Sequence, residues 1–394
     1  MKVFVINQHG EILMPCHPKK ARLLLVKGKA KVLSRSPFTI QLKYGSTGYK
    51  QELTLGVDTG HNEVGLSVTS ETKELFSGVA LMRNDISKKM TDRKMYRRNR
   101  RNRLRYRKPR FLNRKASTRV GRLAPSVQWK VDAHEKLINQ LKAFMPITKV
   151  VLETGTFDPH KLKNPDIQNE QYQKGVQYGF ENVKAYILSR DGYKCQCGKK
   201  GCSSKLEVHH IIYRSHSGSD APENLITLCS KYHKALHDGK LTLNIKKHKS
   251  LQSVTTMNVI RSQLLKLFPD AIETFGYVTK ANRYQWGIEK THSNDAFIIA
   301  GGSFQKREQE QTITFKRKNN RSIQKNRKGF APSIRKQRYI IQPKDLVRFE
   351  GKQYQAVGMQ NKGAYLKMTD GVKAVVKSMK KIEIVFHQKG VVYA

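Results

Sequence analysis

The stretch of sequence that decides the fold is LEVHHIIYRSHSGSDAPENLITLCSKYHKALH, from Leu206 to His237. It places His209 and His210 side by side at the end of a short strand pattern, and His233 and His237 four residues apart in a helical pattern. Adjacent residues of a strand point to opposite faces, whereas residues four apart in a helix share a face. The pattern therefore predicts that one of the paired histidines binds a cation while the other faces a water molecule.

The same stretch supplies the groups that a single-metal nuclease needs. Such an enzyme uses about two protein ligands, which leave positions for phosphate and water, and an unligated imidazole that acts as a general base. Asn224 begins the turn into the apolar segment LITLC. A purely structural zinc site, or histidines that only make hydrogen bonds, are the alternative interpretations.

Cysteines bracket the histidines. The chain has five cysteines, and four of them lie close to this stretch in the sequence. An odd total and this clustering favour a metal site or reduced thiols over disulfide bonds, and therefore a reducing compartment. The four candidate ligands of a structural zinc ion are Cys195, Cys197, Cys202 and Cys229.

The composition indicates a polyanionic partner. The chain has 394 residues, enough for two or three domains, and 76 Lys and Arg against 30 Asp and Glu give it a formal charge of +46. Such a charge would repel itself unless nucleic acid neutralised it. A membrane surface also attracts cations, but the sequence has no run of eighteen apolar residues and begins without the apolar core of a signal peptide. We therefore expect a soluble intracellular protein.

Much of the charge lies in RKMYRRNRRNRLRYRKPRFLNRK, from Arg93 to Lys115. So many like charges at helical spacing would melt an isolated helix, and we expect it to become ordered only against phosphates. The planar guanidinium group favours structured RNA at least as much as duplex DNA, while a solvated or nuclear-targeting segment is the alternative. A second basic segment, 316–338, is predicted to be a linker or another arm that contacts the phosphate backbone. The candidate nucleic-acid-binding residues are Arg93, Arg97, Arg98, Arg100, Arg101, Arg103, Arg105, Arg107, Arg110 and Arg114.

Several apolar segments predict a sheet. QELTLGVDTG, NEVGLSVTS and KELFSGVALM follow one another closely and predict three antiparallel strands joined by tight turns. The segment VDAHEKLINQLKAF predicts a helix, and ITKVVLETG, residues 147–155, predicts a buried strand after it. HSNDAFIIAGG predicts a further helix that starts near Asp295.

Asp58 and Glu153 share a position, because each ends a predicted apolar strand and is followed by Thr-Gly. A buried lone carboxylate costs several kcal/mol unless it is paired or binds a cation. Together with Asp295 they predict a three-carboxylate site for Mg²⁺, in which two ions activate water and stabilise the leaving oxygen of a phosphodiester. His292, three residues before Asp295, is predicted to position or deprotonate that water. A turn-forming or capping role is the alternative for any one of these acids.

The histidine stretch resembles the HNH, or ββα-metal, nuclease family. The resemblance implies that His210 is the general base, that His209 and His233 bind the metal ion, and that Asn224 orients the loop. His237 matches a position that is often histidine. The family frequently adds a zinc knuckle of two Cys-x-x-Cys pairs, and here the sequence departs from that pattern. Cys195 and Cys197 are one residue apart, Cys202 is extra, and Tyr232 stands where the last cysteine would be.

The three acids resemble the split RuvC active site of an RNase H-like domain. GVDTG is the first segment, VVLETG the second and HSNDAF the third, with the HNH stretch between the second and the third. This order is shared with the CRISPR type II single-effector nucleases, in which an Arg-rich bridge helix grips the guide RNA. The shorter IscB family, encoded in transposons, is a nearer resemblance. Its amino-terminal Pro-Leu-Met-Pro signature is similar to ILMPCHPKKARLLLVKGKAKVL, from Ile12 to Leu33, although Ile12 replaces the first proline.

The resemblance implies an α/β multidomain protein: an RNase H-like (RuvC) core split in sequence, an inserted ββα-metal HNH domain, an Arg-rich bridge helix and a small C-terminal β-barrel. The barrel is expected to contact a short motif beside the DNA target, and a stabilising cap is its alternative role. The implied boundaries are 1–52 for the Pro-Leu-Met-Pro domain, 53–92 for RuvC segment I, 93–115 for the bridge helix, 116–180 for RuvC segment II, 181–250 for HNH, 251–305 for RuvC segment III, 306–340 for a basic linker that contacts RNA, and 341–394 for the barrel.

The implied function is that of an OMEGA RNA-guided DNA endonuclease. A long structured omega RNA pairs with one DNA strand, HNH cuts that strand and RuvC cuts the displaced one. The implied cofactor is Mg²⁺, for which Mn²⁺ can substitute, with structural Zn²⁺ as a further expectation. The implied state is a monomeric ribonucleoprotein in a prokaryotic cytoplasm, associated with the nucleoid when it is bound to DNA. The alternatives are a protein-only HNH/RuvC endonuclease of homing or repair type, and a noncatalytic RNA-binding protein.

Overall fold

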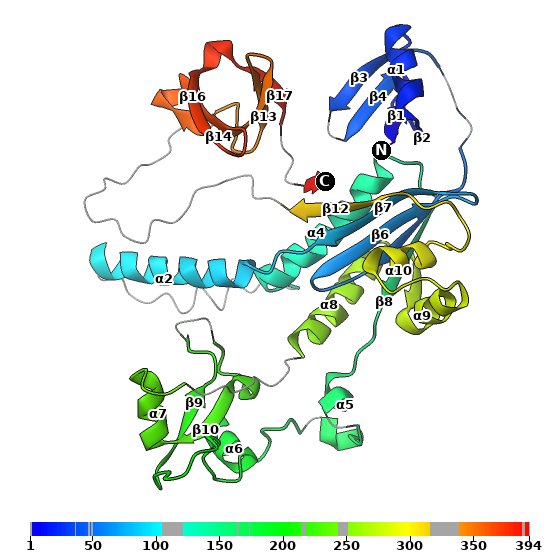
Figure 1. Cartoon of the computed structure of the whole chain (residues 1–394). Coiled ribbons are helices and arrows are strands. Elements are labelled where there is room, and N and C mark those ends of the chain that lie inside the picture. The colour runs from blue at the N-terminus through cyan, green and yellow to red at the C-terminus, as the bar shows by residue number, and fades with distance from the viewer. Residues whose placement is uncertain are drawn as a thin grey trace. The chain divides into compact units, whose positions relative to one another are not determined.

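The computed structural model describes residues 2–35, 37–45, 48, 50–104, 121–163, 165–172, 174–214, 218–242, 251–315, 339–387 and 391–393. The chain forms two compact units (Figure 1). The first unit comprises Met1–Arg83, Trp129–Thr154 and Gln263–Ala394, and the second comprises Asn84–Gln128 and Gly155–Ser262. The architecture is mixed α/β, as the sequence predicts.

The first unit is built on a seven-stranded sheet with the order β11-β8-β5-β6-β7-β12-β18. Strands β5, β6 and β7 pair antiparallel in sequence order, which confirms the predicted meander. Strand β8 pairs parallel with β5 and follows helix α4, Pro125–Lys142, so the predicted succession of helix and inner strand is also confirmed. The strand bounds are Thr54–Asp58 (β5), Glu63–Thr69 (β6), Glu74–Leu81 (β7), Lys149–Thr154 (β8), Ile272–Phe275 (β11), Glu310–Phe315 (β12) and Val391–Tyr393 (β18).

Helix α10, His292–Ile299, packs directly on one face of this sheet, because glycines open the space for it. A Cβ atom at Gly56 of β5 would overlap the Ala296 carbonyl oxygen, and one at Gly65 of β6 would overlap the His292 carbonyl oxygen. Gly65 is the register partner of Asp58, so the start of α10 is held beside the end of β5. Figure 1 shows α10 in front of β6, with helix α9, Gly276–Gln285, beside it.

The opposite face of the sheet is covered by α4. Gly56 of β5 pairs with Ser67 of β6, and Ser67 pairs with Ser77 of β7, so the side chains of both serines lie on the face that α10 covers. Ser77 pairs with Glu310 of β12, and Phe315 lies five residues further along that strand, so its side chain is on the other face. There its ring contacts Trp129 of α4 edge-on, with ring centroids 5.1 Å apart. Apolar α4 side chains such as Leu137 are fully buried there.

Two smaller sheets complete the first unit. The N-terminal sheet has the order β2-β1-β4-β3 and carries helix α1. Its elements are Val3–Ile6 (β1), Ile12–Cys16 (β2), Pro18–Val26 (α1), Ala30–Arg35 (β3) and Phe38–Leu42 (β4), around a core that includes Val5, Leu13, Ala21 and Ile40.

The C-terminal sheet is antiparallel and curled, with the order β16-β15-β14-β13-β17 (Figure 1). Among the residues that the structure describes, no pairing joins its edge strands β16 and β17 into a closed barrel. Its elements are Leu346–Phe349 (β13), Lys352–Gln360 (β14), Asn361–Gly363 (η4), Tyr365–Thr369 (β15), Ala374–Ser378 (β16), Met379–Lys381 (η5) and Glu383–Phe386 (β17).

The second unit contains a compact β-β-α element. Strand β9, Leu206–His210, pairs antiparallel with β10, Leu225–Cys229, and helix α7, Ser230–His237, follows at once. The predicted strand, turn, strand and helix are therefore confirmed. The other elements that lie wholly or partly in this unit are Ile86–Leu104 (α2), Pro159–Lys163 (α5), Asn169–Tyr172 (η1), Val183–Arg190 (α6), Pro222–Asn224 (η3) and Gln252–Leu267 (α8).

The Arg-rich segment is partly described. Helix α2 starts at Ile86, before the predicted start at Arg93, and Arg93, Arg97 and Arg98 lie exposed on it. The side chains of Arg100, Arg101 and Arg103 lie outside the described set, as do the whole residues Arg105, Arg107, Arg110 and Arg114 and the basic segment 316–338. Within the described residues, no helix combines the length and apolarity needed to cross a membrane.

Candidate functional site

Three histidines of the second unit converge. The ligand atoms of His209, His233 and His237 all lie within 4.8 Å of one another. The His209 ring centroid is 5.2 Å from that of His233 and 5.3 Å from that of His237, and the last two rings are 4.7 Å apart. His209 comes from β9, and the other two come from one face of α7. The structure thus brings together the two predicted ligands and adds His237, whose spacing of four from His233 is the sequence signal for it.

The environment of His209 suits a cation ligand. Its side chain is buried, and its Nδ1 atom has no hydrogen-bond partner. Burial, and then the neighbouring His233 and His237, lower the pKa of His209 to about 4, so the ring is neutral at physiological pH. A neutral imidazole with an orphaned buried nitrogen is the form that binds a divalent metal ion. The residues present therefore fit a metal ion held by three imidazoles.

A carboxylate orients one of these histidines. Glu207 Oε2 lies 2.6 Å from His233 Nδ1. Glu207 shares a strand face with His209, because the two residues are two apart in β9. A carboxylate on one ring nitrogen leaves the other nitrogen for a metal ion and makes it more basic. Glu207 was not anticipated, although this alternation in LEVHH is a signal that could have identified it.

His210 points to the other face of β9, as predicted. Its Nε2 atom lies 2.8 Å from Asp220 Oδ1, and Arg214 donates to the same oxygen from Nε and Nη2 at 2.9 and 2.7 Å. The hydrogen bond from His210, and then those from Arg214, hold the pKa of Asp220 below its usual range. The ionised Asp220 accepts a hydrogen bond from the Nε2–H group of His210. Nδ1 of His210 is then the nitrogen that can accept a proton. Asp220 lies in a loop, and no feature of the sequence marked it.

Asn224 holds the loop that follows His210. Its side-chain Oδ1 accepts a hydrogen bond from the Ile212 backbone N–H at 3.0 Å, and its Nδ2 donates to the carbonyl oxygens of Ile212 and Ser219 at 3.0 and 2.8 Å. Asn224 is fully buried, so these bonds are shielded from water. This geometry agrees with the loop-orienting role expected for Asn224.

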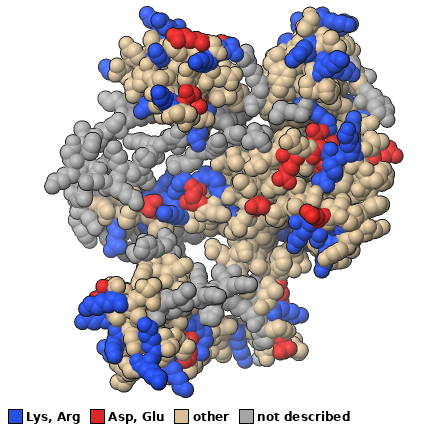
Figure 2. Space-filling model, in the orientation of Figure 1, with Lys and Arg blue, Asp and Glu red and all other residues tan. Residues whose placement is uncertain are grey.

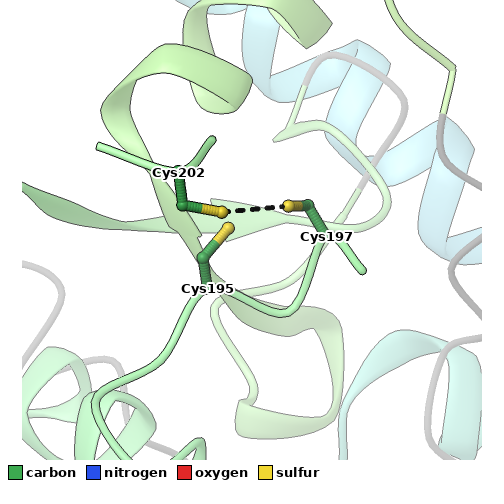
Figure 3. Close-up of side chains that lie close together, drawn as sticks. All are labelled: Cys195, Cys197 and Cys202. Carbon is green, nitrogen blue, oxygen red and sulfur yellow. Dashed lines mark hydrogen bonds between the residues drawn. The ribbon is translucent and has the colours of Figure 1, made fainter. Parts of the chain in front are cut away.

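Three cysteines of the second unit lie together (Figure 3). The sulfur atoms of Cys195, Cys197 and Cys202 are all within 4.8 Å of one another, and those of Cys197 and Cys202 are 3.6 Å apart. Cys229 joins them through its backbone N–H, which donates to the Cys195 sulfur at 3.1 Å. Three thiols in mutual reach are a donor set that zinc accepts, although a structural zinc site needs four ligands. Tyr232, which stands at the missing cysteine position, donates its hydroxyl to the Lys200 carbonyl oxygen at 2.6 Å.

The predicted acids of the first unit also converge. Asp58 of β5 and Glu153 of β8 are register partners on adjacent parallel strands, so their side chains leave the same sheet face. Thr59 Oγ1 donates to the Glu153 carbonyl oxygen at 2.6 Å and ties the two strand ends together. Asp295 enters from the first turn of α10, which packs on that face.

Burial and mutual repulsion mark these acids as a site. Burial, together with the negative charges of Asp58 and Asp295, raises the pKa of Glu153 to about 7, and its Oε2 atom is buried without a partner. Burial and the charge of Asp58 raise the pKa of Asp295. Clustered carboxylates that repel one another are the donor set that Mg²⁺ prefers. The residues present therefore fit a hard divalent cation.

His292 lies among these acids. Its Nδ1 atom is 2.5 Å from Asp58 Oδ2, and its Nε2 atom is 3.6 Å from Glu63 Oε2. The hydrogen bond with Asp58 raises the pKa of His292. The Asp58 carboxylate thus favours the protonated form of this imidazole.

Arg283 of α9 was not anticipated. Its Nε atom lies 3.0 Å from Asp295 Oδ1 as an ion pair, without the alignment of a hydrogen bond. Both side chains are largely buried, so this positive charge partly offsets the repulsion among the acids. The arginine is one of many in this chain, and nothing in the sequence distinguishes it.

Comparisons with known proteins locate the same two regions. A family model described as RRXRR protein matches residues 3–175, and one described as HNH endonuclease matches residues 195–239. The type IV methyl-directed restriction enzyme EcoKMcrA of Escherichia coli strain K12 is 33% identical over 113 residues, which cover 27% of this chain and 38% of that enzyme.

Solved structures give weaker likenesses. Two crystal structures of Streptococcus thermophilus Cas9, in complex with the AGAA PAM and with the GGAA PAM, are 19% and 18% identical, each with a TM-score of 0.29. They match 45% and 46% of this chain and 26% of their own. The chain thus spans well under half the length of the relatives that it matches.

The HNH match contains the whole histidine cluster, whereas the RRXRR match contains Asp58, Glu153 and the arginine-rich helix. The chain carries both segments in this order, and the combination fits the IscB-like family of RuvC/HNH nucleases.

Proposed function

We propose that the chain is an RNA-guided DNA endonuclease that cuts both strands of its target, with one metal site for each strand. The observation that carries the proposal is the presence of two separate, metal-competent clusters in one polypeptide. One consists of Asp58, Glu153 and Asp295, and the other of His209, His233 and His237.

In the second unit, His209, His233 and His237 would hold a divalent ion, and Glu207 would orient His233. The ion, when bound, supplies a positive charge that stabilises the phosphate and the leaving oxygen. His210 acts as general base through Nδ1, with Asp220 holding the opposite nitrogen. Asn224 keeps the loop after His210 in place. This site would cut the strand that pairs with the guide.

In the first unit, Asp58, Glu153 and Asp295 would hold Mg²⁺, for which Mn²⁺ can substitute. The sheet around them takes its strands from separate parts of the chain and is covered on one face by α10. This fold is proposed to be the RNase H-like core of a RuvC nuclease. His292, which lies beside Asp58, would in its neutral form position or deprotonate the attacking water. This site would cut the displaced strand.

Nucleic-acid binding is supported by charge. The formal charge of +46 needs a polyanion, and Figure 2 shows Lys and Arg spread over the visible face of both units. Helix α2 is proposed to be the bridge helix, since Arg93, Arg97 and Arg98 are exposed on it. An omega RNA would supply sequence specificity by base pairing, and the C-terminal sheet would contact a short motif beside the target. The cysteine cluster would hold a structural zinc ion.

The segment boundaries expected from the sequence stay part of this proposal. Asp58, Glu153 and Asp295 belong to one compact unit, and the histidine cluster belongs to the other, whose residues lie between the parts of the first unit in the sequence. This division supports an insertion of HNH into a split core.

The test is to purify the full chain from cells that carry its native flanking sequence and to sequence the RNA that copurifies. The proposal predicts one long structured RNA, and a plasmid that matches its guide should be linearised in the presence of Mg²⁺. Cleavage that is equally efficient after complete removal of RNA would contradict RNA guidance and favour the protein-only endonuclease. An RNA-bound chain that cuts no DNA under these conditions would favour the noncatalytic RNA-binding protein.

A further inference from the structure

Helix α9 presents two different faces. Thr279 and Arg283 are buried and four residues apart, so they define the inner face. Tyr277, Lys280 and Tyr284 follow the helical spacing of three and four residues on the opposite side, and all three are exposed. The two tyrosines are largely exposed, with exposed fractions of 74% for Tyr277 and 69% for Tyr284. Packing of the first unit does not use this outer face.

The outer face combines aromatic rings with positive charge. Lys280 Nζ lies 5.7 Å from the centroid of the Tyr284 ring. Tyr277 stacks on Phe275 with a centroid distance of 6.0 Å and an interplanar angle of 5°, so its orientation is held from one side. Helix α9 has no acidic residue. Flat rings with cations beside them, and no negative charge on the helix, match a ligand made of bases and phosphates.

The helix also starts at the acid cluster. A Cβ atom at Gly276, the first residue of α9, would lie 3.2 Å from Glu153 Oε1. Arg283, on the inner face, pairs with Asp295. One helix therefore touches two of the three acids and carries the exposed tyrosines next to them. A strand whose phosphodiester lay at the acids would pass over or beside this helix.

We propose that Tyr277 and Tyr284 stack on bases of an unpaired DNA strand and thereby place that strand at the acid cluster. The strand must be unpaired, because the bases of a duplex are already stacked and cannot receive a tyrosine ring. The inference rests on the proposed nuclease role of Asp58, Glu153 and Asp295, since that role makes DNA rather than RNA the strand that reaches this place. Tyr277 and Tyr284 are binding residues in this proposal and take no part in the chemistry.

Photocrosslinking tests the stacking directly. The full chain carrying Asp58→Ala, which should bind the displaced strand without cutting it, is irradiated with a single-stranded DNA probe that contains iododeoxyuridine, and the crosslinked peptide is identified by mass spectrometry. We expect a crosslink within α9 that drops about tenfold when Tyr277→Ala and Tyr284→Ala are combined. Tyr277→Phe with Tyr284→Phe should retain it. The matched control is Phe304→Ala, which removes another ring of the same unit that is 80% exposed. It should leave the α9 crosslink unchanged.

Cleavage kinetics separate this inference from the proposed function. In the otherwise native chain, loss of both rings should raise KM for the displaced strand about tenfold and change kcat by less than about twofold. An unchanged KM, or an α9 crosslink formed with an iodouridine RNA probe but not with the DNA probe, would overturn the inference while leaving the nuclease proposal intact. An α9 crosslink to DNA in a chain that never cuts the displaced strand would support the strand-binding face and contradict the nuclease proposal.

Discussion

The two candidate metal sites are assembled in opposite ways. The histidine site comes from one contiguous stretch, in which a strand pair and the helix after it place three imidazoles together. The acid site combines Asp58, Glu153 and Asp295, which are far apart in the sequence and meet only because β5, β8 and α10 share one sheet face. The histidine site can form as soon as its own short segment folds, whereas the acid site requires the whole first unit.

The two sites also differ in charge. The histidine site offers nitrogen donors, and burial lowers the pKa of His209 to about 4, so this ring is uncharged without metal. Three carboxylates repel one another, and the structure offsets this with the hydrogen bond between His292 and Asp58, the raised pKa of Glu153 and the nearby charge of Arg283. The acid site is therefore the more dependent of the two on a cation.

The largest expected effect separates the sites by strand. Asp58→Ala should lower cutting of the displaced strand roughly thousandfold or more and leave cutting of the guide-paired strand within about twofold. His210→Ala should do the reverse. The measurement uses a guide-matched duplex with a different label on each strand.

Controls for this pair are Asp270→Ala in the first unit and His160→Ala in the second, both exposed positions outside the proposed sites. If Asp58→Ala or His210→Ala abolished both cuts while the fold stayed intact, the assignment of one site to each strand would be wrong.

A smaller effect is expected at His237. Removing a third imidazole in His237→Ala should weaken Co²⁺ binding at the histidine site at least about tenfold, because one of three donors is lost. The visible absorption of Co²⁺ reports this binding, and Asp58→Ala serves as the comparison with an intact histidine cluster. Identical Co²⁺ spectra and affinities for His237→Ala and the native chain would show that His237 is not a ligand.

Glu207→Gln should weaken metal binding at the same site by about 10- to 100-fold and reduce cutting of the guide-paired strand, since it removes the carboxylate that orients His233. Glu181→Gln, the same change at an exposed glutamate of the second unit, is the matched control. An effect as large in Glu181→Gln would point to a general loss of charge instead of a role in positioning His233.

The smallest expected effect is on stability. In metal-free protein the pKa of Glu153 is about 7, against 4.5 in an unperturbed glutamate, so the folded chain retains a proton between these values that the unfolded chain has lost. The stabilising contribution of Glu153 is thus present below about pH 4.5 and disappears as the pH rises through about 7. The Tm of the chain in a chelator should fall over this range more than that of Glu153→Gln, and Mg²⁺ should remove the difference above pH 7. Parallel Tm curves for the two proteins would contradict the raised pKa.

Local patterns predicted much of the fold and both sites. Apolar segments joined by short turns identified β5, β6 and β7, and the shared Thr-Gly after Asp58 and Glu153 placed both acids at strand ends. The spacing of His233 and His237 predicted a shared helix face, although the sequence reading did not include His237 among the ligands.

Long-range packing escaped prediction for a physical reason. Arg283 and Asp220 act through contacts made by tertiary folding, and neither has a local pattern that distinguishes it from other charged residues. The sheet order β11-β8-β5 depends on how the chain crosses from one strand to the next. The hydrophobic periodicity of the sequence does not encode such crossovers. The C-terminal segment alternates as a barrel would, yet alternation fixes which residues face inward without fixing whether the edges close.

The most direct test of two independent metal sites is anomalous diffraction from crystals of the full chain, bound to its RNA and soaked in Mn²⁺. The account predicts one peak among Asp58, Glu153 and Asp295 and a second among His209, His233 and His237. A map with the three acids dispersed and no peak between them, while the histidine site is filled, would contradict it.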